Sequence, residues 1–166
     1  YEMYGTSEIG TATSVCVNDH KKNLKSVGKP YANISIKILS NKNNFLPKIK
    51  KGEIVCKTPF IFDRYYNMTR ETKESFYKGY FKTGDIGYLN KSNYLYYLGR
   101  KKNIIKISGN VVYAEDVEDI LLRNKKILEA SVIGLSDKNN FEKIALCAVL
   151  NSKSFTKENI YHYCQN

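Results

Sequence analysis

The stretch 99–118, GRKKNIIKISGNVVYAEDVE, divides the chain and decides its fold. It opens on a glycine and three consecutive cations, where the backbone can pivot. An apolar run at 103–107 predicts a short strand, the Ser-Gly-Asn at 108–110 predicts a turn, and a helix is expected to open on Glu115 and Asp116. Two carboxylates in a first turn suit the positive end of a helix dipole. The first glycine of the stretch therefore marks a boundary with the residues that precede it.

Short strands separated by turns are predicted before this boundary. Ile34, Ile36 and Ile38 alternate with polar residues, a pattern typical of a strand with one buried face. Further strands are expected at 53–57 and 94–98. Several short strands at turn-separated intervals indicate a small barrel or sandwich.

After the boundary, the predicted order is strand, strand, helix, strand, strand, helix, which describes a small α+β unit. The second pair of strands is expected at 128–135 and 143–150. Thr156 is expected to cap the last helix, with Phe155 and Ile160 as a hydrophobic staple. The predicted fold class of the chain is α+β, with a small β-barrel-like subdomain followed by a small α+β domain.

Composition excludes several classes of protein. A hydrophobic content of 42% over 166 residues is that of a globular protein, and no apolar run approaches the roughly 20 residues that span a bilayer. The formal net charge of +11 comes mostly from scattered lysines, whereas nucleic-acid readers favour clustered arginines. Nucleic-acid binding is therefore a minor alternative. The arginines are well separated: Arg64, Arg70, Arg100 and Arg123.

The cysteines predict neither disulfides nor a metal site. Cys16, Cys56, Cys147 and Cys164 form no CxxC pair and have no metal-ligand spacing with a histidine. Cys56 and Cys147 lie in apolar strand-like runs, where cysteine usually behaves as a small buried hydrophobe. We expect a reduced, cytoplasmic chain.

Two stretches carry groups that can bind phosphate and sugar. In YGTSE (4–8), glycine lets a ligand approach the backbone, and hydroxyls and a carboxylate can hold phosphate oxygens and Mg²⁺, although most such loops bind nothing. In KTGD (82–85), Asp85 can accept hydrogen bonds from the vicinal hydroxyls of a ribose. The alternative for Asp85 is a turn aspartate that bonds its own backbone.

Short motifs occur along the chain in an order typical of one enzyme superfamily. They are YGTSE (4–8), SVGKP (26–30), GEI (52–54), YYN (65–67), KTGD (82–85), GR (99–100) and IKISG (105–109). With these motifs the sequence resembles the C-terminal part of the adenylate-forming superfamily, which includes acyl-CoA synthetases, peptide-synthetase adenylation domains and luciferases. The resemblance covers nearly the whole chain, and the ordered set is highly specific.

The resemblance implies an activity for the full-length protein. It would activate a small-molecule carboxylic acid with Mg·ATP to an acyl-adenylate, release pyrophosphate and pass the acyl group to a thiol. We expect coenzyme A as the thiol and a role in fatty acid metabolism, with transfer to a carrier-protein pantetheine as the alternative. A rival of another class is a non-catalytic nucleotide-binding or regulatory module.

The resemblance also implies roles for single residues. Tyr4 would pack on the adenine and Ser7 would bond a phosphate oxygen. Asp85 would take both ribose hydroxyls, and Arg100 would support the same sugar. The implied nucleotide-binding set is Tyr4, Gly5, Thr6, Ser7, Asp85 and Arg100, with Glu8 as the Mg²⁺ ligand.

A second group of implied roles belongs to thiol transfer. Lys102 falls at the hinge position of the superfamily, and Lys106 and Gly109 would be presented to the active site in the transfer state. The implied division is 1–98 as the β-rich end of the large AMP-binding domain, 99–102 as the hinge and 103–166 as an incomplete, mobile small domain.

Departures from the superfamily pattern concern four positions and two missing elements. Ser7 replaces a customary threonine, Phe81 a tyrosine or tryptophan, Arg64 a glycine and Asp116 a glutamate. The Gly/Ser/Thr-rich phosphate-gripping loop, expected upstream, and a lysine expected near the C-terminus are not in the sequence.

We therefore expect the 166-residue chain alone not to form an acyl-adenylate, because it lacks these two phosphate-contacting elements. Pyrophosphate release with ATP and a panel of carboxylic acids measures this activity. Robust release by the isolated chain would contradict the expectation.

Overall fold

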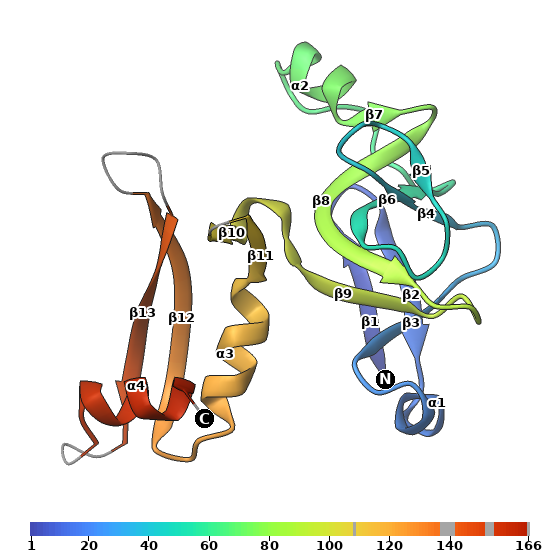
Figure 1. The fold of residues 1–166 in the computed structure, drawn as a ribbon. Helices are drawn as coiled ribbons and strands as arrows, with labels where there is room; N and C mark the ends of the chain where they lie inside the picture. Colours follow the sequence, from blue (N-terminus) through green and yellow to red (C-terminus); the bar gives the residue numbers. More distant parts are fainter. Residues whose placement is uncertain (108, 137–141, 152–154, 166) are drawn as a thin grey trace. The chain divides into compact units, whose positions relative to one another are not determined.

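The computed structural model describes residues 1–107, 109–136, 142–151 and 155–165 and divides the chain into two compact units (Figure 1). The first unit comprises Tyr1–Lys101 and the second Lys102–Asn166. Each unit has its own cluster of buried hydrophobic residues, so each is described by itself.

The first unit, all of whose backbone the structure describes, is a nine-stranded antiparallel sheet with two short helices. Its hydrogen-bonded order is β1-β2-β3-β9-β8-β6-β4-β5, and β7 pairs with β8. The predicted β-rich subdomain is confirmed, but the sheet is open and does not close into a barrel. The elements are β1 (Glu2–Thr6), β2 (Gly10–Val15), α1 (Val17–Lys22), β3 (Ser26–Pro30), β4 (Ser35–Leu39), β5 (Phe45–Leu46), β6 (Gly52–Lys57), α2 (Thr69–Glu74), β7 (Phe76–Tyr77), β8 (Tyr80–Leu89) and β9 (Leu95–Arg100).

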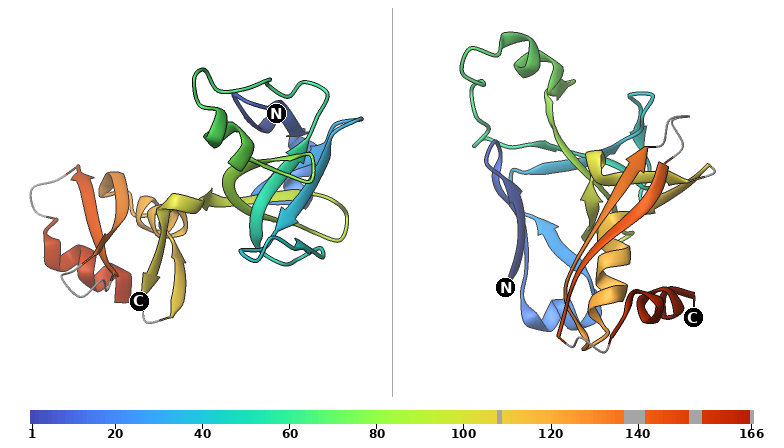
Figure 2. Two further views of the ribbon diagram at one scale, coloured as in Figure 1. Left: turned by 90° about the horizontal axis from the view of Figure 1, so that it is seen from above. Right: turned by 90° about the vertical axis from the view of Figure 1, so that its left-hand side faces the viewer.

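The strand β8 is central to this sheet because it pairs with β6, β7 and β9, and it appears as a long curved ribbon (Figures 1 and 2). Glycines at 84 and 87 do not interrupt β8, since one strand of ten residues runs through both. A register shift between Ile86 and Gly87 absorbs the irregularity, which is how a β-bulge bends a strand without ending it.

The 4–8 stretch is divided between a strand end and a turn, because residues 4–6 belong to β1 and residues 7 and 8 to the turn that follows. Tyr4, Gly5 and Thr6 pair with β2, with a register shift between Tyr4 and Gly5. Only the next three residues reverse the chain, and the Ile9 amide donates to the Thr6 carbonyl at 3.2 Å. Glycine and hydroxyl residues are typical of turns, but the backbone groups of Gly5 and Thr6 find partners in β2. The hairpin pairing therefore continues through these two residues.

The hydrophobic cluster of the first unit draws side chains from β1, β2, β4, β6, β8 and β9. The predicted alternation at 34–38 is confirmed in part, because Ile36 and Ile38 are buried and Ile34 packs against them. Phe81 is buried among Phe62 and Phe76, with ring centroids 5.4 and 5.7 Å away. A phenylalanine therefore suits this position, where a polar ring tip would need a buried partner. The buried members are Tyr4, Ile9, Ala12, Ile36, Ile38, Ile54, Cys56, Phe81, Leu89 and Leu95.

The second unit confirms the predicted order of strand, strand, helix, strand, strand, helix. A 3-10 turn precedes the first strand, so this strand begins at Ile104 instead of residue 103. Ser108, in the predicted turn, lies outside the described residues. The elements are η1 (Lys101–Asn103), β10 (Ile104–Ile107), β11 (Asn110–Tyr113), α3 (Ala114–Leu122), β12 (Ile127–Ser136), β13 (Glu142–Leu150) and α4 (Lys157–Gln165).

Both helices of the second unit contribute to its core, and α3 lies along β12 (Figure 1). The expected staple is supported because Phe155 is buried and Ile160 packs against the same cluster. Tyr163 of α4 donates from its hydroxyl to the Ile120 carbonyl at 3.1 Å, which ties the two helices together. The buried members are Ile105, Ala114, Leu121, Ile127, Val132 and Phe155.

All four cysteines are free, as the sequence predicts. Cys56 is buried, and this burial raises the pKa of its thiol to about 11. The prediction that Cys147 is buried is wrong, because it lies opposite Ser131 on the exposed face of the β12–β13 hairpin. None of the helices in the described ranges combines the length and hydropathy needed to span a bilayer.

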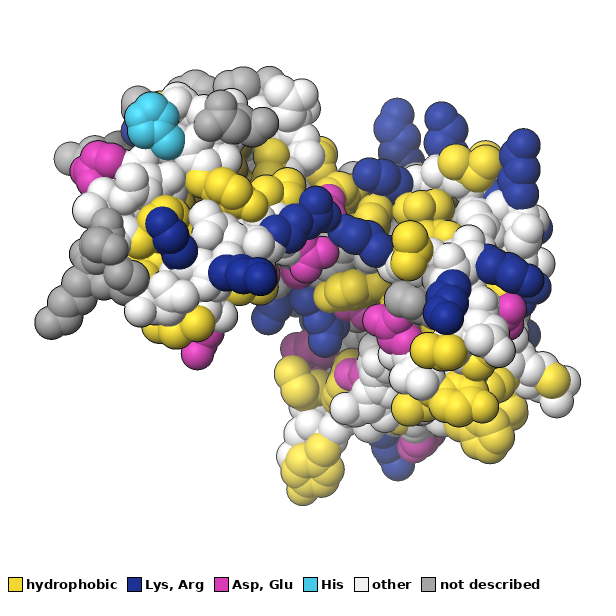
Figure 3. Space-filling view, turned by 90° about the horizontal axis from the view of Figure 1, so that it is seen from below, with side chains coloured by type: hydrophobic (Ala, Val, Ile, Leu, Met, Phe, Trp, Pro, Cys, Tyr) yellow, Lys and Arg dark blue, Asp and Glu magenta, His cyan; other side chains and the backbone are white. Residues whose placement is uncertain are grey.

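Basic side chains are spread over the surface rather than concentrated. On the face shown in Figure 3, Lys and Arg side chains are interspersed with hydrophobic and acidic ones. A nucleic-acid-binding face instead gathers its cations in a patch or stripe. This face therefore lends no support to the nucleic-acid alternative.

Two glycines of the first unit provide a matched test of its packing. Gly28 (φ +99°) and Gly79 (φ +77°) both adopt the left-handed region, but a Cβ on Gly28 would collide with the carbonyl of Ser14, whereas one on Gly79 meets nothing within 4 Å. We expect Gly79→Ala to lower the free energy of unfolding by about 1–2 kcal/mol. Gly28→Ala should lower it at least twice as much, because the β2 and β3 backbones must separate. Urea unfolding of both variants measures the difference, and equal losses would contradict the steric argument.

Candidate nucleotide site

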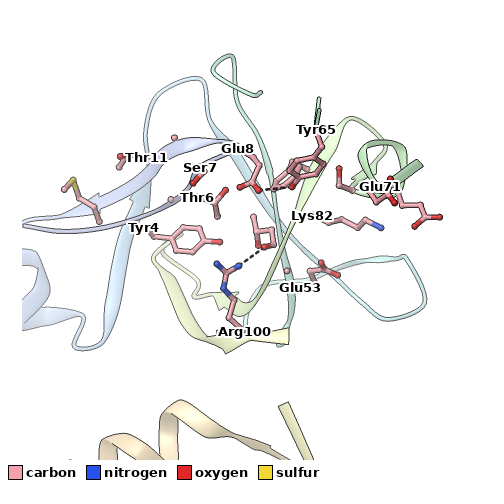
Figure 4. A pocket seen from close by; sticks show the side chains of 18 residues that line it. Tyr4, Thr6, Ser7, Glu8, Thr11, Glu53, Tyr65, Glu71, Lys82 and Arg100 are labelled. Atoms are coloured by element: carbon pink, nitrogen blue, oxygen red, sulfur yellow. Dashed lines mark hydrogen bonds between the residues drawn. The ribbon is translucent and has the colours of Figure 1, made fainter. Parts of the chain in front are cut away.

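A cavity of about 930 Å³ in the first unit gathers most of the residues singled out in the sequence (Figure 4). The β1–β2 hairpin forms one side, and the strands β8 and β9 form another. The loop before α2 and α2 itself complete the lining. The lining residues are Met3, Tyr4, Gly5, Thr6, Ser7, Glu8, Gly10, Thr11, Glu53, Tyr65, Glu71, Glu74, Ser75, Phe81, Lys82, Thr83, Gly84 and Arg100.

Asp85 is buried and is not itself a lining residue, but it binds two lining residues that are distant in sequence. The Tyr4 hydroxyl donates to Asp85 Oδ2 at 2.7 Å, and Arg100 Nη1 lies 3.1 Å from Asp85 Oδ1. The Asp85 amide donates to the Thr83 hydroxyl at 3.1 Å. The carboxylate therefore does not act as the ordinary turn aspartate of the alternative interpretation. It joins β8 to β1 and β9.

Asp85 and Arg100 differ strongly in exposure. The Asp85 side chain is 4% exposed and that of Arg100 is 49% exposed, so the guanidinium is the outer member of the pair. Arg100 also donates to the Thr83 carbonyl at 3.3 Å, and in Figure 4 it points into the same space as Tyr4 and Glu8. A ligand in the cavity therefore meets Arg100 before it meets the carboxylate.

Tyr4 lies in the wall of the cavity with its hydroxyl directed at Asp85. Burial raises the pKa of Tyr4 above its usual value, and the charge of Asp85 raises it further, so the hydroxyl stays protonated and donates. The ring also packs against Tyr97, with centroids 6.1 Å apart. These contacts hold the phenol in one orientation.

Glu8 is a carboxylate that lines the cavity and is bound by a tyrosine. The Tyr65 hydroxyl donates to Glu8 Oε1 at 2.8 Å, drawn as a dashed line in Figure 4. Burial by itself raises the pKa of Glu8, but the hydroxyls of Thr6 and Tyr65 outweigh that effect and bring it below its usual range. Glu8 is therefore ionised at neutral pH. Burial, together with the Glu8 bond, raises the pKa of Tyr65 to about 12.

Ser7, Gly5 and Thr6 also line the cavity. Ser7 is exposed at the hairpin turn between β1 and β2, where its hydroxyl is accessible to a ligand. A Cβ on Gly5 would collide with the carbonyl of Gly10 across the hairpin. Glycine at position 5 is therefore required by strand pairing, whatever ligand binds there.

The residues implied in thiol transfer lie in the second unit. Lys102 belongs to η1 and lines a smaller cavity of about 260 Å³ with Glu118 and Glu142. Lys106 is exposed on β10, and its amide donates to Glu142 Oε2. Gly109 has φ +84° and open space around its Cβ direction, so its turn conformation alone favours glycine.

Several lining residues were not predicted. Glu53 forms an ion pair with Lys101 at 2.6 Å, and its side chain is largely buried. Lys82 and the α2 residue Glu71 also border the cavity. Tyr65 belongs to the YYN motif, which was noted without a role. Its distance of 57 residues from Glu8 leaves no local signal of their contact.

The chain is similar in sequence to known proteins. Residues 1–66 match the family model described as AMP-binding enzyme. A 2-succinylbenzoate–CoA ligase of Bacillus cereus is 32% identical over 166 residues, which is 99% of this chain and 34% of that protein. The chain thus spans about a third of the length of the curated relatives that it matches.

Solved structures of related enzymes are similar to this chain in fold. O-succinylbenzoate coenzyme A synthetase (MenE) from Bacillus subtilis, in complex with ATP and magnesium ion, is 30% identical with a TM-score of 0.89, covering 99% of this chain and 34% of that one. Its complex with the acyl-adenylate intermediate OSB-AMP gives a TM-score of 0.91 at the same identity and coverage. The amide bond synthetase McbA from Marinactinospora thermotolerans, 23% identical with a TM-score of 0.86 over 98% of this chain and 34% of that chain, shares the fold.

The ordered motifs and the sequence and structural relatives point to one family. Residues 1–66 match the AMP-binding enzyme family, and nearly the whole chain is similar to adenylate-forming enzymes.

Proposed function

We propose that the full-length protein is an AMP-forming acid–CoA ligase. It activates a carboxylic acid with ATP as the acyl-adenylate, releases pyrophosphate and transfers the acyl group to coenzyme A. One observation carries this proposal: Tyr4 and Arg100, which both bind Asp85, line the same cavity as Ser7 and Glu8. That set can grip a sugar at one end and phosphates with a cation at the other.

Asp85 receives the ribose hydroxyls in this proposal. A carboxylate has enough lone-pair sites to accept two hydroxyl donors in addition to Tyr4. Because Arg100 covers the carboxylate and its own side chain is half-exposed, the guanidinium turns aside to admit the sugar and then binds it from the other face. Tyr4 keeps the carboxylate oriented during this exchange.

Ser7 and Glu8 are assigned to the phosphates of ATP, Ser7 by a direct hydrogen bond and Glu8 through Mg²⁺. The Ser7 hydroxyl donates to a phosphate oxygen, which also explains why serine can replace threonine at this position. Mg²⁺ bound by Glu8 would neutralise phosphate charge while the carboxylic acid displaces pyrophosphate from the α-phosphorus. The residues fit such an ion, because Mg²⁺ in nucleotide sites uses one or two carboxylates plus phosphates and water. Within the described ranges, no three His, Cys, Asp or Glu side chains gather into a metal site built by protein alone.

Thiol transfer is assigned to the second unit. Residues 99–102 form the hinge between 1–98 and 103–166, and Lys102 is its pivot. The division of the chain between Lys101 and Lys102 supports this position. Lys106 and Gly109 are presented to the acyl-adenylate after the swing, and the open space beside Gly109 suits the passage of a pantetheine arm.

The names of the relatives suggest which carboxylic acid to test as the substrate. Their names specify 2-succinylbenzoate, so this aromatic acid is the first to test. The expectation of fatty acid metabolism finds no support among them. Coenzyme A is favoured over a carrier protein as acceptor because the curated relatives are CoA ligases.

Asp85→Asn tests the nucleotide site. Losing hydrogen bonds to a charged acceptor is worth about 1.5–3 kcal/mol, so AMP binding by the full-length protein should weaken by roughly 10- to 150-fold. Asp63→Asn is the matched control, since the Asp63 side chain is 87% exposed and pairs only with its neighbour Arg64 in the described contacts. Calorimetric titration with AMP measures both variants, and thermal unfolding verifies their folding. Unchanged affinity in Asp85→Asn would refute the assignment.

Lys102→Pro tests the pivot. Proline fixes φ and should restrict the swing, so one half-reaction should be impaired at least tenfold more than the other. Lys102→Ala removes the same side chain but leaves the backbone free, and it should affect both half-reactions alike. Pyrophosphate release and thioester formation are measured separately in the full-length protein. Equal loss in both half-reactions for the proline variant would argue against a hinge at this position.

A further inference from the structure

The loop between β6 and α2 holds Glu8 at two points. The Phe62 amide donates to the Glu8 carbonyl at 2.8 Å, and the Tyr65 hydroxyl donates to the Glu8 carboxylate at 2.8 Å. One short segment therefore fixes both the backbone and the side chain of the same residue. The second bond engages Oε1 of a side chain that lines the cavity.

Tyr65 is itself held in place. Its ring packs on Phe62 with centroids 4.6 Å apart, and Phe62 in turn packs against Phe81 of the buried core at 5.4 Å. The Tyr65 amide donates to the Thr72 hydroxyl at 3.1 Å. A phenol fixed at its ring and at its backbone presents its hydroxyl in a single direction.

The turn that follows preserves this orientation. The Met68 amide donates to the Tyr65 carbonyl at 3.3 Å, and Asn67 takes φ +54° in the left-handed region that asparagine tolerates. Tyr66, next in sequence, is 88% exposed. The YYN motif therefore directs its first tyrosine into the cavity and its second into solvent.

We propose that Tyr65 is a positioning residue that orients the Glu8 carboxylate, through Oε1, to bind the cation that accompanies the nucleotide. This inference rests on the proposed function, because it assigns a support to the same cation site. Groups that orient a metal-binding carboxylate by hydrogen bonding typically contribute 10–100-fold to metal affinity. The geometry also predicts that Tyr65 contributes nothing to ligands that bind without a cation.

Tyr65→Phe tests the proposal, because it removes the hydroxyl and keeps the ring on Phe62. In the full-length protein, with no carboxylic acid present, we expect the affinity for ATP in saturating Mg²⁺ to fall about tenfold. AMP affinity measured without metal should stay within twofold of wild type. Tyr66→Phe removes an equivalent hydroxyl from an exposed ring and should match wild type in both titrations.

A double-mutant cycle tests whether the effect passes through Glu8. In a Glu8→Gln background, Tyr65→Phe should cause less than a twofold further loss, since the oriented carboxylate is already gone. Additive losses, or an equal fall in AMP and Mg·ATP affinity, would overturn the positioning role, as would an unchanged Mg·ATP affinity in Tyr65→Phe.

The two proposals fail in distinguishable ways. If wild-type protein does not bind Mg·ATP, the proposed function falls and this inference falls with it. If Mg·ATP binds normally and Tyr65→Phe behaves as wild type, only this inference falls. If Asp85→Asn leaves AMP affinity unchanged while Tyr65→Phe weakens Mg·ATP selectively, the sugar assignment fails and the role of Tyr65 stands.

Discussion

A carboxylate enclosed in protein needs compensating partners, and the site depends on how Asp85 obtains them. Burying an ionised group is unfavourable unless charge and hydrogen bonds replace the lost water. Asp85 on β8 receives the Tyr4 hydroxyl from β1 and the Arg100 guanidinium from β9. β1 and β8 are not neighbours in the sheet, so this contact crosses between strands that share no backbone hydrogen bonds. The residues assigned to the sugar are thus also residues that hold the unit together.

Asp85 and Glu8 each accept a hydrogen bond from a tyrosine hydroxyl, but they differ in exposure and in their other partners. Each accepts a hydrogen bond from a tyrosine whose pKa is raised, so both phenols remain protonated donors. Asp85 is almost fully enclosed and is paired with Arg100, whereas Glu8 is half-buried at the hairpin turn. The enclosed Asp85 carboxylate suits the neutral hydroxyls of a sugar, which can take the place of water. The more accessible Glu8 carboxylate suits a cation that also binds phosphate and water. Exposure and partners together therefore distinguish two chemically identical groups.

The two units have separate cores and carry separate sets of implied functional residues. Tyr4, Glu8, Asp85 and Arg100 all belong to the first unit, and the residues implied in thiol transfer belong to the second. Two of the glycines in these sets also have structural reasons for being glycine: Gly5 from strand pairing and Gly109 from its backbone dihedral. A glycine in a motif can therefore be required by the fold as well as by a ligand, and of these two only Gly109 also has open space beside it.

The sequence by itself determined the local features: the strand alternation at 34–38, the order of elements after residue 103, and the acidic start of α3. Such features arise from residues a few positions apart, whose pattern is legible without the fold. The tertiary structure alone decided that the sheet stays open, that Cys147 is exposed, and that Tyr4 and Tyr65 each reach a carboxylate. Those hydrogen bonds join residues 81 and 57 positions apart. Contacts over such separations depend on strand order and register, which short-range hydrophobic periodicity does not encode.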